Sequence, residues 1–298
     1  MLGVPGTNTV VAVVLALVAT LLRIGGLAPD APPPDPFVYV ALGDSYVSGP
    51  LIFPHDDTFV LQACGQSTRN YPHIASELLS VDVFRDVSCG GATINKFEDE
   101  QDVTQGIVPP QFDALDDTVD AVTLTMGGND VGFVGLALDC GRVNPNDAPC
   151  WPNSIDENGV DMVSRDIAEM GDELAVALDA LHLRAPNAEV FVVSYPDALP
   201  DDGKGCWPYI PILDPDMAYL SAKYKEMNAE LQSTALAHDA HYVDIYTAGI
   251  GHDVCQPPGL AWVNGLVLAP PSFPAHPNDL SYLSSGPIVA DAIAAALA

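Results

Sequence analysis

The tripeptide Gly43-Asp44-Ser45 interrupts a short apolar run that starts at Phe37. The run is rich in β-branched and aromatic residues, which is typical of a buried strand. Open α/β folds bind their ligands at the carboxyl ends of such strands. A serine at this point, beside a glycine that permits a tight turn, is therefore placed to act as a nucleophile. Asp44 and Ser45 are also suited to cap a following helix, and this stretch alone leaves both interpretations open.

Two further segments with small or amide-bearing residues follow predicted strands. Gly91 comes after an alternating strand at 81–87, and Asn129 comes after an apolar strand at 120–126. The carboxyl ends of parallel strands meet at one edge of a sheet, so both residues are expected near Ser45. A nucleophilic serine needs hydrogen-bond donors for the oxyanion that develops during attack. A glycine N–H and an asparagine amide can both donate such bonds.

A larger fold must position these strand ends. Strand-like runs alternate with helical patterns, which predicts an α/β protein whose parallel sheet is covered on both faces. No linker-like gap divides residues 37–298, so we expect one domain. The predicted strands are 37–43, 81–87, 120–126, 189–195 and 241–245, and the predicted helices are 70–79, 160–183, 216–238 and 287–298.

The charge and composition of the chain exclude several classes of partner. The 298 residues carry a formal net charge of −30, because 40 Asp and Glu stand against 10 Lys and Arg. Nucleic acid and anionic membrane surfaces need basic contacts, so neither is an expected partner. The sequence has no C-x-x-C pair and no H-E-x-x-H motif, and we expect neither a metal nor a cofactor. We also expect a monomer.

An apolar run from Val10 to Leu22 precedes the predicted domain. Its 13 residues are too few for a comfortable membrane span but suit the core of a secretory signal, with small residues at 26–28 for cleavage. No Lys or Arg precedes the run, so an uncleaved membrane anchor is the alternative. We assign 1–28 to a signal peptide or N-terminal anchor and 29–36 to a Pro-rich spacer. The protein is expected outside the cell, either secreted or anchored facing outward.

The chain contains six cysteines, an even number. Beside a signal-like segment, this count indicates three disulfides formed in an oxidising compartment. Several pairings are possible for six cysteines. We favour sequential pairing because each bridge would then close a loop-rich interval. The predicted bridges are Cys64–Cys89, Cys140–Cys150 and Cys206–Cys255.

Four short blocks along the chain resemble the SGNH, or GDSL, hydrolase family in content and order. The blocks are Gly43-Asp44-Ser45, Gly91, Gly127-Gly128-Asn129-Asp130 and His276-Pro277-Asn278. The likeness runs from about Phe37 onward and is strongest to secreted, disulfide-bonded actinobacterial lipases and esterases with a G-D-S-Y variant. It implies a flavodoxin-like α/β/α three-layer sandwich, with 37–298 as the catalytic domain.

The resemblance also implies a role for each block. Ser45 would be the nucleophile and His276 the general base. The oxyanion hole would consist of the N–H groups of Ser45 and Gly91 and the side-chain amide of Asn129. The expected reaction is hydrolysis of carboxylic esters of lipids or small acylated molecules through an acyl-enzyme on Ser45. Removal of acetyl groups from carbohydrate, or a non-catalytic module that binds esters or glycans, remain alternatives.

The chain departs from the family pattern beside the histidine. Many members carry an aspartate three residues before it, whereas this chain has Phe273. A phenylalanine side chain cannot accept a hydrogen bond from an imidazole N–H, so we expect the backbone at Phe273 to orient His276. Asp279 follows the histidine and is a poor substitute. The resulting prediction is a Ser45–His276 dyad without a carboxylate.

Overall fold

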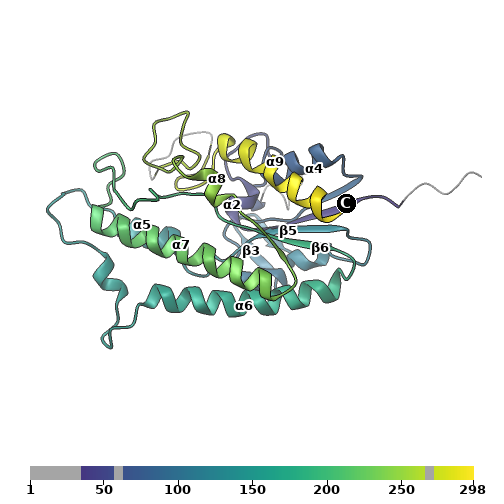
Figure 1. The fold of residues 1–298 in the computed structure, drawn as a ribbon, viewed down its shortest axis with the longest axis horizontal. Coiled ribbons are helices and arrows are strands. Elements are labelled where there is room, and N and C mark those ends of the chain that lie inside the picture. Colours follow the sequence, from purple (N-terminus) through teal and green to yellow (C-terminus); the bar gives the residue numbers. More distant parts are fainter. Residues whose placement is uncertain (1–34, 57–62, 266–271) are drawn as a thin grey trace, which may run out of the picture. The chain divides into compact units, whose positions relative to one another are not determined.

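The central sheet consists of five parallel strands in the order β2-β1-β5-β6-β7. The computed structural model describes residues 35–56, 63–265 and 272–298 (Figure 1). The predicted signal or anchor at 1–28 and most of the spacer at 29–36 lie outside the described residues. In the described part, no helix has the length and apolar character needed to cross a membrane.

The strand order identifies the topology as flavodoxin-like. The strands are β1 (Val38–Gly43), β2 (Val83–Asp86), β5 (Ala121–Thr125), β6 (Glu189–Val193) and β7 (His241–Val243). Counted within this sheet, the order is 2-1-3-4-5, and every neighbouring pair is parallel. The chain changes direction across the sheet between β1 and β5, and ligands bind at such a switch point in open α/β sheets. The predicted fold class is confirmed.

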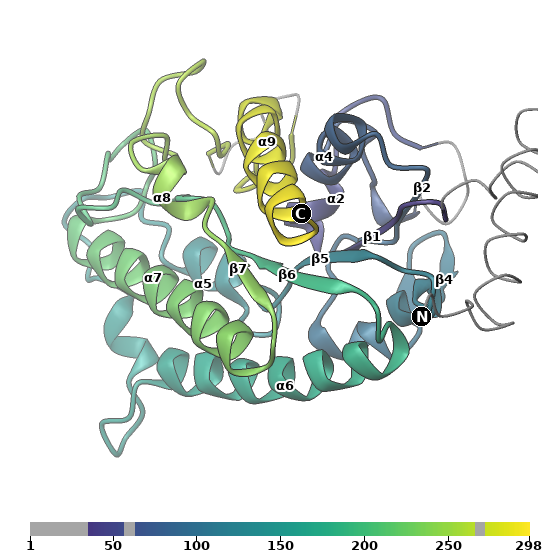
Figure 2. The same ribbon diagram turned by 45° about the vertical axis from the view of Figure 1, so that its right-hand side comes forward.

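Two pairs of long helices cover the two faces of the sheet (Figure 2). Helices α4 (Tyr71–Leu79) and α9 (Asp279–Ala296) lie on one face, and α6 (Met162–Arg184) and α7 (Asp214–Ala237) lie on the other. Alternate residues of β1 enter the two cores. Val40 packs with the α6 and α7 side, whereas Tyr39 packs with α4 and α9. The continuous burial of β1 therefore follows from its position between two helical layers.

Shorter elements complete the described chain. They are α2 (Ser45–Ser48), η1 (Ile94–Phe97), β3 (Gln101–Val103), β4 (Gly106–Val108), η2 (Gln111–Ala114), α5 (Phe133–Asp139), η3 (Trp151–Ser154) and α8 (Tyr246–Gly249). Strands β3 and β4 form a separate antiparallel pair.

The last helix begins earlier than predicted. The sequence suggested a start at Pro287, but α9 begins at Asp279 and contains Pro287 in its interior. The Asn278 side chain caps this helix by accepting bonds from the N–H groups of Leu280 and Ser281. The cap therefore determines the start of the helix, and proline is accommodated inside it.

Candidate active site

The end of β1 brings Ser45 to the switch point of the sheet. Asp44 is the N-cap of α2, and its Oδ1 accepts a hydrogen bond of 2.8 Å from the Tyr46 N–H. Gly43 has φ +146°, and a Cβ at this position would collide with Val47 and with the Thr125 carbonyl. Glycine is therefore required where the strand turns into the helix. The helix-cap interpretation is confirmed for Asp44, and the neighbouring Ser45 side chain faces the histidine.

The side chains of Ser45 and His276 are in direct contact although 231 positions separate them. Ser45 Oγ lies 2.7 Å from His276 Nε2, and both residues are buried. On the other side of the ring, Nδ1 lies 2.7 Å from the carbonyl oxygen of Pro274. Because a carbonyl can only accept, Nδ1 carries the proton and Nε2 accepts from the Ser45 hydroxyl. This is the tautomer that a general base needs.

The electrostatics of His276 favour the neutral ring. Burial lowers the pKa of His276 below its ordinary value of 6.5, and the bond to the Pro274 carbonyl opposes part of that shift. The imidazole of His276 is therefore unprotonated at neutral pH and able to accept a proton.

The backbone group that orients His276 lies one residue from the predicted position. We expected the backbone at Phe273, but the carbonyl of Pro274 accepts from the ring. The Phe273 carbonyl instead accepts from the backbone N–H of His276 at 3.2 Å. The chain makes a turn here, and the carbonyl of its central peptide faces the imidazole.

The Asn129 side chain joins the two predicted donor segments. Its Nδ2 donates a bond of 2.8 Å to the carbonyl of Ala92, the residue after Gly91. An asparagine amide has two N–H groups, so one remains for a further acceptor. Asn129 and Ser45 line the same small cavity of about 20 Å³. Gly91 adopts φ +76° on the turn that this bond holds against Asn129.

A buried tyrosine that the sequence reasoning missed connects these segments. The hydroxyl of Tyr195 donates to Asp44 Oδ2 at 2.6 Å and accepts from the Gly128 N–H at 2.8 Å. Burial raises the pKa of Asp44 to about 7. Tyr195 lies just beyond the end of β6, and this position at the ligand-binding edge was the signal in the sequence.

Gln111 is a second residue that the sequence reasoning missed. Its side-chain Oε1 accepts from the Gly43 N–H at 2.8 Å, and its Nε2 donates to the Gly43 carbonyl at 2.9 Å. The side chain is buried and gives the Gly43 N–H an acceptor, while the Gly43 carbonyl also accepts from the backbone N–H of Cys89 at 2.9 Å. No local pattern marks such a contact between residues 68 positions apart.

Comparison with known proteins agrees with this arrangement. The profile of the GDSL-like Lipase/Acylhydrolase family matches residues 41–282, most of the described domain. The chain belongs to this family. Lipase 2 of Streptomyces coelicolor is 34% identical over 244 residues, which cover 81% of each chain. An esterase of Streptomyces scabiei is 29% identical over an alignment of 309 positions, which covers 91% of this chain and 89% of the relative. Membership in the GDSL-like family makes the chain a carboxylic ester hydrolase.

Solved structures share the GDSL-like fold. Phospholipase A1 from Streptomyces albidoflavus NA297 superposes with a TM-score of 0.70 at 23% identity, covering 86% of this chain and 99% of that one. The extracellular lipase from Streptomyces rimosus gives a TM-score of 0.65 at 24% identity with the same coverage.

An apolar cavity lies beside the catalytic candidates of this GDSL-like hydrolase. Its volume is about 40 Å³, and Tyr46, Phe133 and Ala275 contribute to its walls. Tyr46 and Phe133 also line the small cavity at Ser45. The two cavities are therefore neighbours, and the larger one offers an apolar environment next to Ser45.

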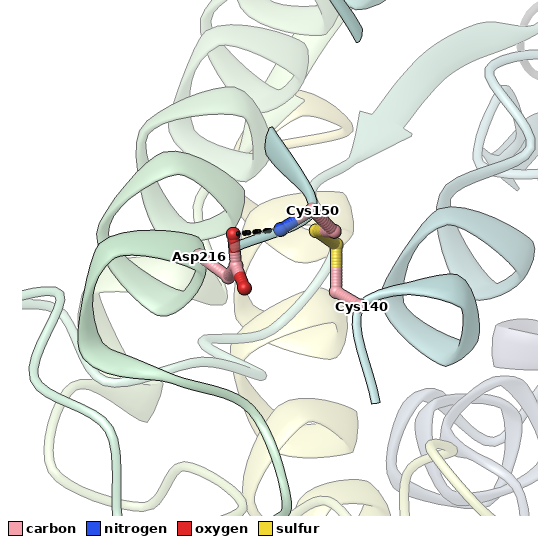
Figure 3. Close-up of side chains that lie close together, drawn as sticks. All are labelled: Cys140, Cys150 and Asp216. Atoms are coloured by element: carbon pink, nitrogen blue, oxygen red, sulfur yellow. Dashed lines mark hydrogen bonds between the residues drawn. A yellow bond between two sulfur atoms is a disulfide. The ribbon is translucent and has the colours of Figure 1, made fainter. Parts of the chain in front are cut away.

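Three disulfides stabilise the loops of the domain. The pairs are Cys64–Cys89, Cys140–Cys150 and Cys206–Cys255, which is the sequential pairing that we expected. Asp216 lies beside the second bridge, and its Oδ1 accepts from the backbone N–H of Cys150 (Figure 3). It also accepts from the backbone N–H of Trp151. The three side chains are close enough to suggest metal ligands. Cysteines joined in a disulfide offer no thiolate, so this group is a structural one.

Proposed function

We propose that the protein is a secreted serine esterase that hydrolyses carboxylic esters through an acyl-enzyme on Ser45. The observation that carries the proposal is the 2.7 Å contact between Ser45 Oγ and His276 Nε2, with Nδ1 held by a backbone carbonyl. In the first step, Ser45 Oγ attacks the ester carbonyl carbon and Nε2 takes the hydroxyl proton. His276 then returns this proton to the departing alcohol. Water attacks the acyl-enzyme with the same base and releases the acid and Ser45.

Three donors would stabilise the oxyanion of each tetrahedral intermediate. We assign this role to the N–H groups of Ser45 and Gly91 and to the side-chain amide of Asn129. The bond from Asn129 to the Ala92 carbonyl supports the assignment, because it fixes the amide against the Gly91 turn. Donors held in place before the reaction lose no free energy by reorganising during it.

The base works in this proposal without a carboxylate partner. The Pro274 carbonyl selects the tautomer and the ring orientation, which are two of the tasks of the aspartate in a triad. A neutral carbonyl stabilises the imidazolium less than a carboxylate would. The lowered pKa of His276 agrees with this difference.

The apolar cavity suggests where the acyl group binds. Its walls contain aliphatic and aromatic side chains, and it adjoins the cavity at Ser45. A volume of about 40 Å³ is well below the ~150 Å³ of an engineered cavity that holds benzene. We therefore infer that short acyl groups of small molecules or lipids are preferred. Acetyl groups on carbohydrate would also fit, which keeps deacetylation as the second candidate.

Secretion is part of the proposal. Three disulfides are typical of proteins that fold in an oxidising compartment. The chain carries a strong excess of acidic residues, which disfavours nucleic acid as a partner. We propose an extracellular monomer whose partner is a small-molecule or lipid ester, or an anchored form if the N-terminal segment is retained.

Replacement of Ser45 tests the function. Ser45→Ala should lose nearly all turnover of p-nitrophenyl esters while its melting temperature stays near that of the wild type. Ser48→Ala is the matched control, because Ser48 is buried in the same short helix and should keep its activity. A phosphonate ester should label the wild type once and leave Ser45→Ala unlabelled. Turnover that survives in Ser45→Ala would refute the mechanism.

The length of the acyl chain separates the candidate functions. A p-nitrophenyl series from acetyl to palmitoyl should peak at the short end if the cavity binds the acyl group. Turnover of acetylated polysaccharide in preference to simple short esters would favour carbohydrate deacetylation. Preference for palmitoyl esters would contradict the acyl-binding assignment of the cavity.

A further inference from the structure

Tyr46, the residue after the nucleophile, contacts the chain around the base in two ways. Its hydroxyl donates a hydrogen bond of 2.6 Å to the carbonyl of Ala275, which is 229 positions away. Its ring also packs against the imidazole of His276, with 5.1 Å between the ring centroids. One side chain thus contacts both His276 and the residue before it.

The contacted segment, Phe273–His276, is a strained turn that we call the base turn. The N–H of His276 donates to the Phe273 carbonyl across it. Pro274 is at the second position, and Ala275 at the third has φ +58°. This pattern is that of a type II turn, which favours glycine at the third position. Alanine is strained there because its Cβ crowds the backbone in the left-handed region.

The strained conformation supplies the group that orients the base. The carbonyl that accepts from His276 Nδ1 belongs to the peptide between Pro274 and Ala275. If Ala275 relaxed to a right-handed conformation, this peptide would rotate and its carbonyl would leave the ring. A backbone acceptor is therefore only as well placed as the turn that carries it.

Hydrogen bonds fix the backbone on both sides of Ala275. Its N–H donates to the carbonyls of Asn264 and Gly265, at 3.0 and 3.1 Å. Its own carbonyl accepts the Tyr46 hydroxyl. The two peptide planes that flank the strained residue are thus both held from outside the turn.

Tyr46 is itself firmly anchored. Its N–H donates to Asp44 Oδ1, and its carbonyl accepts from the hydroxyl of Tyr282 at 3.0 Å. The edge of its ring meets Tyr195, with 5.1 Å between centroids. Burial raises the pKa of Tyr46, so its hydroxyl keeps its proton and remains a donor at neutral pH.

We propose that Tyr46 is a positioning residue whose hydroxyl holds the base turn in the left-handed conformation that presents the Pro274 carbonyl to His276. The inference rests on the proposed role of Ser45 and His276 and adds a residue on which the geometry of the base depends. Tyr46 does not exchange a proton in the reaction. It acts through the turn.

Tyr46→Phe tests the inference, because it removes the hydroxyl and keeps the ring. We expect kcat for a p-nitrophenyl ester to fall about 10- to 100-fold, with KM nearly unchanged, since the loss affects alignment of the base. Tyr39→Phe is the matched control. It removes a fully buried hydroxyl, bonded to Thr123 at 2.7 Å on the sheet, and should keep kcat near the wild-type value.

The pH profile gives a readout that a purely structural role would not move. Burial lowers the pKa of His276, and the bond to the Pro274 carbonyl opposes part of this lowering. Weakening this bond should therefore shift the acid limb of kcat/KM to lower pH in Tyr46→Phe. An unchanged kcat, an unchanged acid limb, or an equal loss in Tyr39→Phe would overturn the proposal.

A second substitution tests the strain directly. In the Tyr46→Phe background, Ala275→Gly should recover part of the lost kcat, because glycine adopts positive φ without a Cβ clash. No recovery would mean that the hydroxyl does not act through the turn, and the proposal would fail. Failure of the proposed function is a separate outcome, since it would appear as turnover that persists in Ser45→Ala.

Discussion

The hydroxyl of Tyr195 lies 2.6 Å from Oδ2 of Asp44, and this pair connects the segment of Ser45 to the turn that carries Asn129. The same hydroxyl accepts from the Gly128 N–H, so one buried group touches both sides of the candidate site. Asp44 and Tyr195 are each 1 % exposed, and this burial raises the pKa of Asp44 to about 7. The spacing between Ser45 and Asn129 therefore depends on Tyr195, a side chain that follows a third strand, β6.

Tyr195→Phe should destabilise the protein and slow the reaction. The change leaves Asp44 Oδ2 and the Gly128 N–H without their partner, and a buried polar group that loses its partner costs about 1–3 kcal/mol. Urea unfolding should report this loss, and kcat should fall because the Asn129 turn loses an anchor. Tyr242→Phe removes a hydroxyl that donates to the Asn228 carbonyl, outside the candidate site, and is the control. Equal effects in the two variants would contradict the connecting role of Tyr195.

Asn129→Ala should reduce kcat on the order of 10²–10³-fold, as removal of one oxyanion donor does in other hydrolases. KM should change little, because the bond strengthens as charge develops in the transition state. Steady-state kinetics with a short-chain ester measures both parameters. Asn95→Ala, at an exposed position on η1, should behave like the wild type. A loss confined to KM would assign Asn129 to substrate binding instead.

The acid limb of the rate profile should lie below pH 6.5. His276 must be neutral to take the Ser45 proton, and burial lowers its pKa from the ordinary value of 6.5. As pH falls, the ring therefore stays neutral below the pH at which an exposed histidine would protonate. Measurement of kcat/KM between pH 4 and pH 9 tests the direction. A midpoint above 6.5 would show that an ionised group stabilises the imidazolium.

Asp197→Asn should stabilise the protein at high pH more than at low pH. Burial, with repulsion from Asp253 as the second cause, raises the pKa of Asp197 from 3.8 to about 7. Between these values the unfolded chain releases the proton and the folded chain retains it. The contribution of this group to stability thus falls as pH rises through the window and stays low above pH 7. Asparagine is neutral at every pH, so the variant does not lose this stability as the pH rises.

Melting temperatures at pH 4 and pH 8 check the Asp197 prediction. The variant should exceed the wild type at pH 8, by about 2–4 °C for each kcal/mol recovered, and should match it at pH 4. Asp201→Asn is the control, because Asp201 is exposed and paired with Lys225. A gain of equal size at both pH values would show that ionisation is not the cause.

The sequence by itself determined the fold class and the main residues of the candidate site. Alternation of strand and helix patterns is a local property of the chain, and it places Ser45 and Asn129 after strands that share one edge of the sheet. Sequential pairing of the cysteines also followed from the sequence, since each bridge closes one loop region. His276 was identified because its block follows the other three in the order that is typical of the family.

The tertiary structure alone decided how these groups are held. Tyr195 reaches Asp44 over 151 positions and Tyr46 reaches Ala275 over 229, and such contacts depend on strand register and helix packing. The carbonyl of Pro274, and not that of Phe273, accepts from the imidazole of His276 because Ala275 has a positive φ. Residue type does not predict this conformation, because alanine adopts it only where surrounding hydrogen bonds offset the strain. Local motifs thus identify the residues of the site, whereas contacts between residues far apart in the sequence determine its geometry.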